Sequence, residues 1–467
     1  MKKVLIVAYY FPPIAASGAM RPLAFCRFLE SYGWAPRVLS VDPTTVYPWH
    51  PLDPQLSSRL PHGVHVDFVP YRGLLQQIIG WRGRVKDLSR FGRKRPSRIA
   101  GVEPTTVSPS QRSKAGKFRE IKDFLLNWGF EFPDPQRAWF GPAVACARRL
   151  PQGEAPDAIL ATGGPWTNFL VGKRIAEYWQ VPLILDYRDP WTSNPYFSFG
   201  SAFLNERSRR LERSIGNVAT RIVANTPELQ AQLEKDHAGF AGKTVTITNG
   251  FDPDLFRNSQ EGILQSTVRK ANFEISHFGT VYGKRTPIVL LQALLDLYLA
   301  GRVTSEHICV RFVGAWEVTD PKCEELAQAL EKVGLLTREG SVPYKECLRQ
   351  MRAADALLVI QPESPLQVPG KIYEYIATGR PLLLLGGDGA TENLVNRHRL
   401  GVVCANRAES IGQLFLDVLE GRRVLAGPNP TETGRFSYQN LTGDLARVLD
   451  EAYDKCRKVR SMKVDVL

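Results

Sequence analysis

Short apolar runs alternate with amphipathic stretches along most of the chain. Residues 3–9 form the first apolar run, a loop rich in Pro and Gly follows at 11–18, and residues 20–32 have helical periodicity. A second apolar run begins at Pro36. Apolar runs of this length are typical of strands buried in a parallel sheet. The chain therefore opens with a predicted strand, glycine loop, helix and strand, as nucleotide-binding α/β domains do.

The same alternation continues to about residue 248 and then starts again. Further strands are predicted at 158–161, 182–185, 221–224 and 244–248. A second series begins with a strand at 274–278, which a basic loop containing glycine and an apolar helix follow. Because 467 residues suit two cores better than one, we expect two α/β domains. Their expected bounds are 1–248 and 249–440, and a helix over 441–467 is expected to pack back on the first domain.

One stretch in the second series has the features of a phosphate site. Pro369 and Gly370 predict the start of a helix, and Gly379 is the residue expected just past its end. Lys371 and Glu374 are three positions apart and so project from one helix face. First-turn amides and Lys371 would suit a diphosphate, while Glu374 could accept hydrogen bonds from ribose hydroxyls. The alternative is an ordinary surface pair between this lysine and this glutamate.

Polar residues also follow strands of the first domain. The segment Asp186-Tyr-Arg-Asp-Pro-Trp191 comes directly after the strand at 182–185. Ligands of open α/β sheets bind beyond the carboxyl ends of strands, so this segment is a candidate site. A buried structural ion pair is the alternative. In the first loop, Gly18 would let the backbone approach a ligand and Arg21 lies near the helix start, although a plain loop glycine and a solvated arginine would look the same.

Composition narrows the class of protein. A hydrophobic content of 43% and a charged content of 23% are those of a globular chain. The seven cysteines are scattered, which predicts free thiols in a reducing compartment and no structural zinc, and no histidine cluster suggests another metal site. No apolar stretch approaches the roughly 20 residues that span a bilayer. The first apolar run stops at Pro12-Pro13 and is interpreted as a strand, not a signal peptide.

The formal charge of +13 calls for an anionic partner, which could be nucleic acid, anionic lipid or a phosphorylated substrate, and the distribution of the charge helps to choose among them. Residues 82–98 hold eight Lys or Arg against one Asp, a net +7, within an expected insertion at about 70–130. The amphipathic segment 73–81, which ends in Trp81, precedes them. This combination suits an anionic membrane surface, although a solvated insertion that binds nothing is the alternative. Nucleic acid is not expected, because no reader motif is present.

Several motifs occur together in one order over nearly the whole chain. They are Phe11-Pro-Pro with Gly18 and Arg21, Asp186-Tyr-Arg-Asp-Pro-Trp191, Asn249-Gly-Phe-Asp252, Phe278-Gly-Thr280, and Lys371-Ile-Tyr-Glu-Tyr-Ile-Ala-Thr-Gly379. In this order and spacing the chain resembles the retaining glycosyltransferases of family 4. Their fold is GT-B, an α/β architecture of two facing Rossmann-like domains with parallel sheets, and the resemblance implies that fold here.

The resemblance also implies roles for individual residues. Lys371 and Glu374 would hold the sugar nucleotide, with Glu374 on the ribose, and Arg188, Asp189 and Lys371 would be the catalytic residues. The remaining donor-binding residues would be Gly18 and Arg21 in the first domain and Gly279, Thr280, Lys284, Arg285, Val342, Pro343 and Gly370 in the second. Among these, Val342 and Pro343 would lie near the base, and Gly18, Lys284 and Arg285 near the diphosphate.

The chain departs from the family pattern at three places. Leu366 stands where many members have a first glutamate, eight positions before Glu374. Gly279-Thr280 replaces a Gly-Arg pair, and Arg188-Asp189 occupies the region where many members have an active-site histidine. These departures leave the expected diphosphate contacts in place but bear on sugar orientation and catalysis.

The expected activity is transfer of a sugar, with retention, from a nucleotide-diphosphate donor to a hydroxyl of a polysaccharide or lipid-linked glycan. A hexosyltransferase is expected, with Lys284, Arg285 and Lys371 stabilising the leaving diphosphate, so neither a metal nor another cofactor is required. The expected location is the cytoplasm, peripherally at the inner face of the cell membrane. Two alternatives are a nucleotide-sugar epimerase of related fold and a non-catalytic glycosyltransferase-like subunit.

Overall fold

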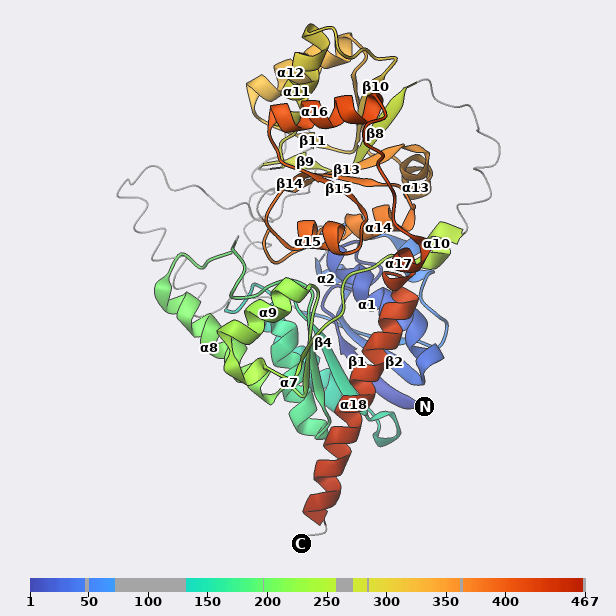
Figure 1. The fold of residues 1–467 in the computed structure, drawn as a ribbon. Coiled ribbons are helices and arrows are strands. Elements are labelled where there is room, and N and C mark those ends of the chain that lie inside the picture. The colour runs from blue at the N-terminus through green and yellow to red at the C-terminus, as the bar shows by residue number, and fades with distance from the viewer. Residues whose placement is uncertain are drawn as a thin grey trace, which may run out of the picture. The chain divides into compact units, whose positions relative to one another are not determined.

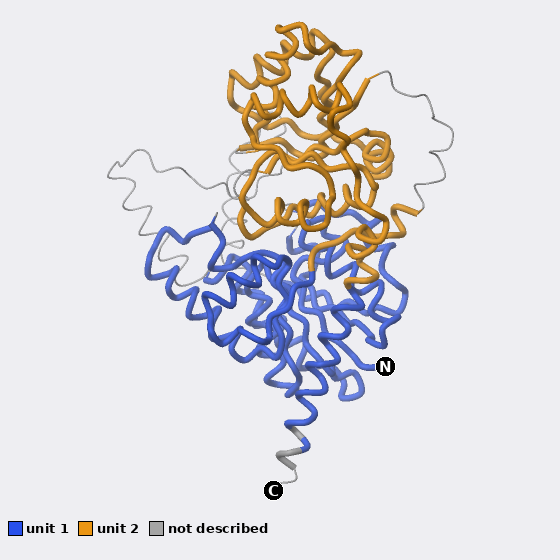
Figure 2. The backbone as a smooth tube through the Cα atoms, viewed as in Figure 1, with its two compact units in different colours: residues 1–247, 442–467 blue, residues 248–441 orange. Residues whose placement is uncertain are grey.

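A computed structural model describes residues 1–46, 50–71, 132–195, 197–257, 272–283, 285–361 and 364–464 (Figure 1). The chain divides into two compact units (Figure 2). Unit 1 comprises residues 1–247 and 442–467, and unit 2 comprises residues 248–441. Each unit has its own parallel sheet and is described separately below.

Unit 1 is built on a seven-stranded parallel sheet in the order β3-β2-β1-β4-β5-β6-β7. Its strands are β1 (Lys2–Val7), β2 (Trp34–Val41), β3 (His65–Val69), β4 (Ala158–Thr162), β5 (Leu183–Tyr187), β6 (Arg221–Ala224) and β7 (Thr244–Thr246). The reversal of strand order between β1 and β4 is that of Rossmann-like sheets, which bind ligands at this point. The parallel sheet predicted for the first domain is confirmed.

The helices of unit 1 follow the predicted alternation. They are α1 (Ser17–Phe28), α2 (Pro43–Val46), α3 (Pro54–Ser57), α6 (Phe140–Arg148), α7 (Thr167–Trp179), α8 (Ala202–Val218) and α9 (Pro227–Asp236). The helix predicted over 20–32 begins at Ser17, and its last turn, Leu29–Tyr32, is a tighter 3-10 helix. Gly33 closes it with a φ of 82°, a left-handed conformation that glycine adopts without strain.

The long helix α18 (Tyr438–Val464) begins in unit 2, and its residues from Thr442 onward belong to unit 1. Asp450 accepts hydrogen bonds from Nζ of Lys2 and, at 2.9 Å, from Nε1 of Trp34. Glu451 pairs with Arg221 at 3.1 Å. Leu445 and Leu449 are fully buried. The helix thus contacts residues of β1, β2 and β6, and Figure 1 shows it running beside the first two.

Unit 2 repeats the plan with a six-stranded parallel sheet in the order β12-β10-β8-β13-β14-β15. The strands are β8 (Phe273–Phe278), β10 (Ile308–Val313), β12 (Leu336–Glu339), β13 (Ala356–Gln361), β14 (Leu382–Gly386) and β15 (Gly401–Cys404). When the strands of each sheet are numbered along the chain, both sheets have the order 3-2-1-4-5-6. The sheet of unit 1 has one further strand, β7, after the sixth. A short parallel pair, β9 (Val281–Tyr282) and β11 (Trp316–Glu317), follows β8 and β10.

Helices cover both faces of the unit 2 sheet (Figure 1). On one face α11 (Ile288–Leu299), α12 (Pro321–Lys332) and α16 (Ala408–Leu419) bury leucine-rich surfaces against the strands. The other face carries α10 (Pro253–Arg257), α13 (Tyr344–Ala353), α14 (Lys371–Ala377) and α15 (Ala390–Arg397). The remaining helix is α17 (Pro430–Arg435). Both faces of β14 are therefore covered, which explains the unbroken run of leucines in its sequence.

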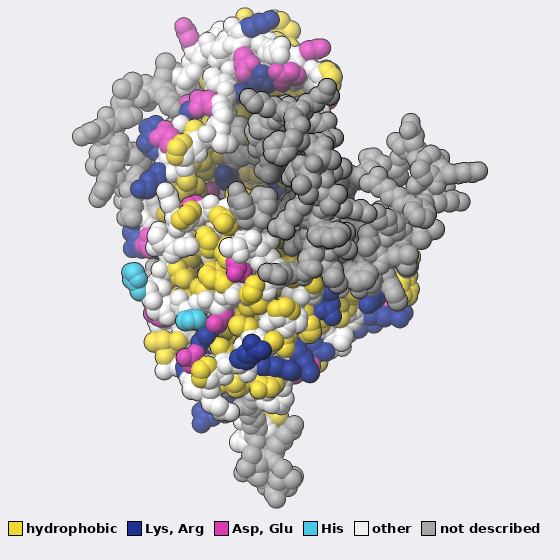
Figure 3. Space-filling view, turned by 180° about the vertical axis from the view of Figure 1, so that it is seen from behind, with side chains coloured by type: hydrophobic (Ala, Val, Ile, Leu, Met, Phe, Trp, Pro, Cys, Tyr) yellow, Lys and Arg dark blue, Asp and Glu magenta, His cyan; other side chains and the backbone are white. Residues whose placement is uncertain are grey.

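No helix in the described ranges is long and apolar enough to cross a membrane. On the face drawn in Figure 3, Lys and Arg side chains of both units are interspersed with Asp and Glu. Most of the basic insertion predicted at about 70–130 lies outside the described residues, and so does Lys284. The prediction that this insertion contacts a membrane therefore still depends on the sequence alone.

Candidate functional site

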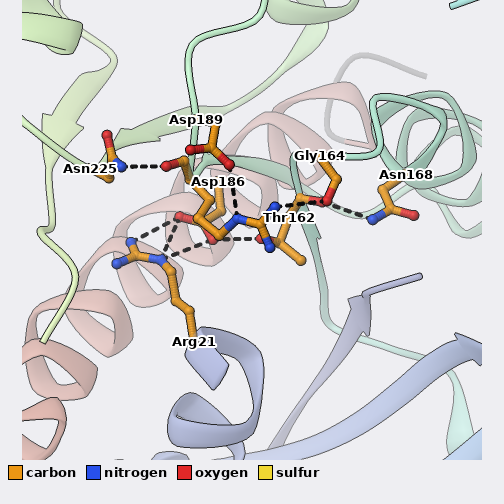
Figure 4. A network of polar contacts seen from close by, with 8 residues as sticks. Arg21, Thr162, Gly164, Asn168, Asp186, Asp189 and Asn225 are labelled. Atoms are coloured by element: carbon orange, nitrogen blue, oxygen red, sulfur yellow. Dashed lines mark hydrogen bonds and ion pairs between the residues drawn. The ribbon is translucent and has the colours of Figure 1, made fainter. Parts of the chain in front are cut away.

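In unit 1, polar groups from three neighbouring strands meet at the carboxyl edge of the sheet (Figure 4). Thr162 is the last residue of β4 and leads into Gly163-Gly164. Asp186 lies near the end of β5, and Asn225 directly follows β6. Because these strands are parallel neighbours, their carboxyl ends deliver the side chains to one edge.

Arg21 and Asp186 form a buried ion pair at this edge of the sheet. Nε of Arg21 lies 3.1 Å from both carboxylate oxygens of Asp186, Nη2 lies 2.9 Å from one of them, and both side chains are 1% exposed. Thr162 also donates a hydrogen bond to this carboxylate, and Arg21 donates one to the carbonyl oxygen of Ile247. Arg21 makes these contacts with other protein groups. The predicted role of Arg21 in donor binding would therefore be indirect: it would position Asp186 and the loop that follows Asp186.

The predicted residues Gly18, Arg188 and Asp189 come together above this pair. Arg188 pairs with the Asp189 carboxylate at 3.1 Å and donates a hydrogen bond of 3.1 Å to the carbonyl oxygen of Gly164. A side chain at Gly18 would collide with the Arg188 guanidinium, so glycine is required for this approach. Asn225 holds the loop from the other side by donating to the carbonyl oxygen of Arg188. The side chain of Asp189 is 40% exposed.

In unit 2, the loop after β8 and the start of α14 lie together at the carboxyl edge. A methyl group added to Gly279 would be 4.0 Å from Cδ of Lys371 and 3.8 Å from Nε2 of His277. The φ of 137° at Gly279 strains any other residue, and Thr280 is exposed beside it. The structure thus places Gly279 close to Lys371, with Thr280 next to Gly279 in the chain.

Two cations at this edge have no counter-charge among the residues that the structure describes. Neither Lys371 nor Arg285 makes an ion pair with a residue in the ranges that the structure describes. The guanidinium of Arg285 lies 5.5 Å from the centroid of the Tyr282 ring. The surface pair considered for Lys371 and Glu374 is therefore not formed. Unpaired cations at the carboxyl edge of a parallel sheet favour an anionic ligand.

Glu374 is held by the segment predicted to lie near a nucleotide base. The hydroxyl of Tyr344, the residue after Val342-Pro343, donates a hydrogen bond of 2.9 Å to Oε1 of Glu374. Val342 packs against the apolar cluster that contains Val368 and Ile372. Gly370 is exposed and precedes α14, a helix of only 7 residues. The amino terminus of so short a helix does not by itself indicate an anion site. Its closing residue, Gly379, has the expected left-handed conformation.

Two residues at this edge were not found by sequence reasoning. Tyr375 joins α14 to β8, because its hydroxyl accepts a hydrogen bond of 2.7 Å from the amide of Phe278 and lies 3.2 Å from the carbonyl oxygen of that residue. His277 lies on β8, where burial and the charges of Lys371 and Arg285 lower its pKa to about 4, against a hydrogen bond to Leu358 that favours the protonated ring. Each partner is distant in sequence, so no local signal marks either residue.

Similar solved structures define the class of fold. A glycosyltransferase from Rickettsia africae has a TM-score of 0.56 at 13% identity, with 97% of this chain and 98% of that chain covered. HepE of Anabaena, solved with UDP and glucose, has 0.51 at 15%, and sucrose-phosphate synthase of Thermosynechococcus elongatus has 0.52 at 12%; both likenesses cover the two chains in full. These likenesses show the α/β fold with two parallel sheets of GT-B glycosyltransferases, as predicted.

A sequence comparison points in the same direction for part of the chain. Residues 85–255 match the model of the family described as Glycosyltransferase Family 4. The matched range includes the loop that carries Arg188 and Asp189. No curated protein sequence matches the chain.

Proposed function

We propose that this protein is a glycosyltransferase that takes a sugar from a nucleotide-diphosphate donor and transfers it to a hydroxyl group of a glycan acceptor. The observation that carries the proposal is a pair of cations at the carboxyl edge of the unit 2 sheet, Lys371 and Arg285, which form no ion pair within the described ranges. The family match over residues 85–255 and the GT-B fold support it. HepE has been solved with UDP-glucose, which makes UDP-glucose the first donor to test.

The proposed reaction replaces one bond of the anomeric carbon by another. The bond from this carbon to the diphosphate oxygen breaks, and the electron pair leaves with the diphosphate. The acceptor oxygen forms the new glycosidic bond, and its proton passes to the departing diphosphate. Lys371 and Arg285 would stabilise the charge that develops on the leaving group, because fixed cations act where charge forms in the transition state. We also propose that the anomeric configuration of the sugar is retained. NMR of the product determines this configuration.

The other site residues take complementary parts in the proposal. Glu374, oriented by Tyr344, would accept hydrogen bonds from the ribose, and Val342 and Pro343 would lie beside the base. In unit 1 the exposed carboxylate of Asp189 would contact the acceptor, with Arg188 fixing its position through the bonds to Asp189 and Gly164. A hexose is the expected sugar.

Calorimetry with UDP, GDP and dTDP tests the proposal and identifies the base. Binding of one of these nucleotides at micromolar to millimolar affinity is expected, as for enzymes in general. Product analysis with the matching sugar nucleotide, with and without acceptor, then separates transfer from epimerisation. A protein that binds none of the three nucleotides would contradict the proposal.

Tyr344→Phe removes the hydrogen bond to Glu374 without changing the packing. A hydrogen bond to a charged group contributes roughly 1.5–3 kcal/mol. Because about 1.4 kcal/mol corresponds to a tenfold change in affinity, we expect nucleotide affinity to fall by about tenfold. Titration calorimetry measures this change. The matched control is Tyr298→Phe on α11, which packs against the other face of the sheet and should leave affinity unaltered. Equal affinities for parent and Tyr344→Phe would remove Tyr344 from the site.

We also propose that the basic insertion places the enzyme at an anionic membrane surface, where a lipid-linked acceptor is concentrated. Each Lys or Arg near such a surface contributes about 1 kcal/mol, so the net +7 of residues 82–98 is enough for reversible binding. Leu74, Leu75, Ile78, Ile79 and Trp81 would add apolar burial. The protein is then expected to sediment with anionic but not with neutral vesicles.

Replacing Arg93, Lys94 and Arg95 by Ser should reduce this sedimentation and leave nucleotide affinity intact. High salt should weaken the parent's binding in the same way, because the charge interaction is screened within about 10 Å at 0.1 M. The control removes three charges elsewhere by replacing the exposed Lys322, Lys332 and Lys458 with Ser. If the two triple variants sediment alike, the insertion is not the anchor.

A further inference from the structure

The hydrogen bond made by His277 fixes which nitrogen of its ring carries the proton. Nδ1 lies 3.0 Å from the carbonyl oxygen of Leu358 on the neighbouring strand β13. A carbonyl oxygen can only accept, so Nδ1 is the protonated nitrogen and Nε2 of the neutral ring presents a lone pair. The ring also packs against Phe312 of β10, with centroids 5.6 Å apart. Both neighbouring strands therefore hold the imidazole in one orientation.

This nitrogen lies near two residues of the predicted donor site, Gly279 and Lys371. Nε2 lies 3.8 Å, and Cδ of Lys371 lies 4.0 Å, from the position where a side chain at Gly279 would begin. Because residue 279 is a glycine, this position places no side chain between the imidazole and the lysine stem. Gly279 is thus close to Nε2, and the charge of Lys371 on α14 acts on the imidazole.

The charges around His277 keep it neutral. Among the described residues, the titratable groups that face it are Lys371 from α14 and Arg285 from the loop after β9, whereas β13 contributes the Leu358 carbonyl and β10 the Phe312 ring. Burial and the two cations lower the pKa of His277 to about 4. Near pH 7 the site consequently contains two positive donors and, beside them, one uncharged acceptor.

A diphosphate cannot use that acceptor, because its ionised oxygens are themselves only acceptors. A hydroxyl group can, because its O–H donates. A nucleotide sugar carries hydroxyls on both sides of its diphosphate, on the ribose and on the sugar that is transferred. An acceptor placed next to the cations that hold the diphosphate is therefore matched to one of these hydroxyls.

We propose that Nε2 of His277 accepts a hydrogen bond from a hydroxyl group of the bound nucleotide-sugar donor. The inference rests on the proposed function and deepens it. Lys371 and Arg285 would bind the diphosphate, which all nucleotide-diphosphate donors share. His277 would accept a hydrogen bond from a hydroxyl that only some donors carry, and so would contribute to donor specificity. A partly buried acceptor left unsatisfied by an analogue that lacks the hydroxyl penalises that analogue, which is how polar sites reject such compounds.

The test compares His277→Asn with His277→Gln by titration calorimetry. The probes are UDP, GDP and dTDP, each with its glucose ester. Asn places an amide N–H near the position of Nδ1 and can keep the bond to Leu358, but it has nothing at Nε2. Gln reaches further and can place its oxygen near Nε2, but it loses the bond to Leu358. Thermal unfolding of both variants is measured in parallel.

We expect His277→Asn to lose about tenfold or more in affinity for the sugar ester that the parent binds, and His277→Gln to lose less. If affinity for the free nucleotide stays within about twofold, the hydroxyl is on the transferred sugar; if it falls equally, the hydroxyl is on the ribose. A purely structural His277 would give the opposite order, with Gln the weaker binder. That order, or an Asn variant that binds like the parent, would overturn the inference.

The pH dependence gives an independent readout. As pH falls toward the pKa of about 4, the ring gains a proton at Nε2 and loses its lone pair. Parent affinity for the sugar ester should therefore be flat near neutrality and fall below about pH 5, and His277→Asn should lack this fall. Affinity that rises on acidification, with proton uptake on binding, would mean that His277 donates to phosphate and would overturn the inference. A parent that binds no probe would overturn the proposed function as well.

Discussion

Lys371→Ala is expected to lower turnover by at least about 10²-fold and to weaken nucleotide binding. Removal of one preorganised group that stabilises developing negative charge typically costs about 10²–10³ in kcat. Lys371 has no ion-pair partner among the described residues, so its full charge is available to a diphosphate. The lost binding energy should be larger in the transition state, where charge on the leaving group increases. Steady-state kinetics and calorimetry on one preparation measure both effects.

The control for this experiment is Lys332→Ala, which removes an equal charge from the exposed end of α12 in the same unit. It should leave both kcat and nucleotide affinity unchanged. Arg285→Ala should also lower both kcat and nucleotide affinity, because it removes the other cation of this site. Full activity in Lys371→Ala would refute the assignment of the donor site to this edge of unit 2.

Asp186→Ala is expected to produce the largest loss of stability. The substitution leaves the Arg21 guanidinium, 1% exposed, without its counter-charge, and it also removes the acceptor for Thr162. Breaking a buried ion pair from one side typically costs about 3–5 kcal/mol in the free energy of unfolding. Denaturant unfolding followed by tryptophan fluorescence suits this measurement, because eight of the nine tryptophans belong to unit 1.

The same loop provides a matched control for that variant. Asp189 also pairs with an arginine, but its side chain is 40% exposed, so Asp189→Ala should cost at most about 1 kcal/mol of stability. It should instead reduce activity through its proposed contact with the acceptor. Equal stabilities for the two alanine variants would show that the Arg21–Asp186 pair does not hold the sheet edge together.

The sequence predicts the architecture well where strands are buried on both faces. The apolar runs at 158–161 and 221–224 coincide with β4 and β6 almost residue for residue, and both parallel sheets follow from the repeated alternation. The edge strands β3 and β12 are not among the predicted strands. Each lies at the end of its sheet and carries exposed polar residues, so the apolar signal that marks a central strand is absent.

The site is predicted less completely, because its decisive contacts join distant parts of the chain. The spacing of Lys371 and Glu374 permits both an ion pair and a ligand site, and it is Tyr344, 30 residues away, that bonds Glu374 in the structure. For Asp186, pattern alone could not separate a ligand group from a buried pair, since its partner Arg21 is 165 residues away. His277 gives no signal at all until Leu358 and Lys371 surround it.

The passage of α18 from unit 2 into unit 1 has a consequence for biosynthesis. When Ile247 leaves the ribosome, unit 1 still lacks the helix whose Asp450 and Glu451 bond Lys2, Trp34 and Arg221. The intervening residues 248–441 must be translated first, which takes roughly 10–40 s at 5–20 residues per second. Unit 2 is contiguous and can close as soon as it emerges. The unit that the ribosome begins first is therefore the one that is finished last, and its α18-binding surface stays uncovered until then.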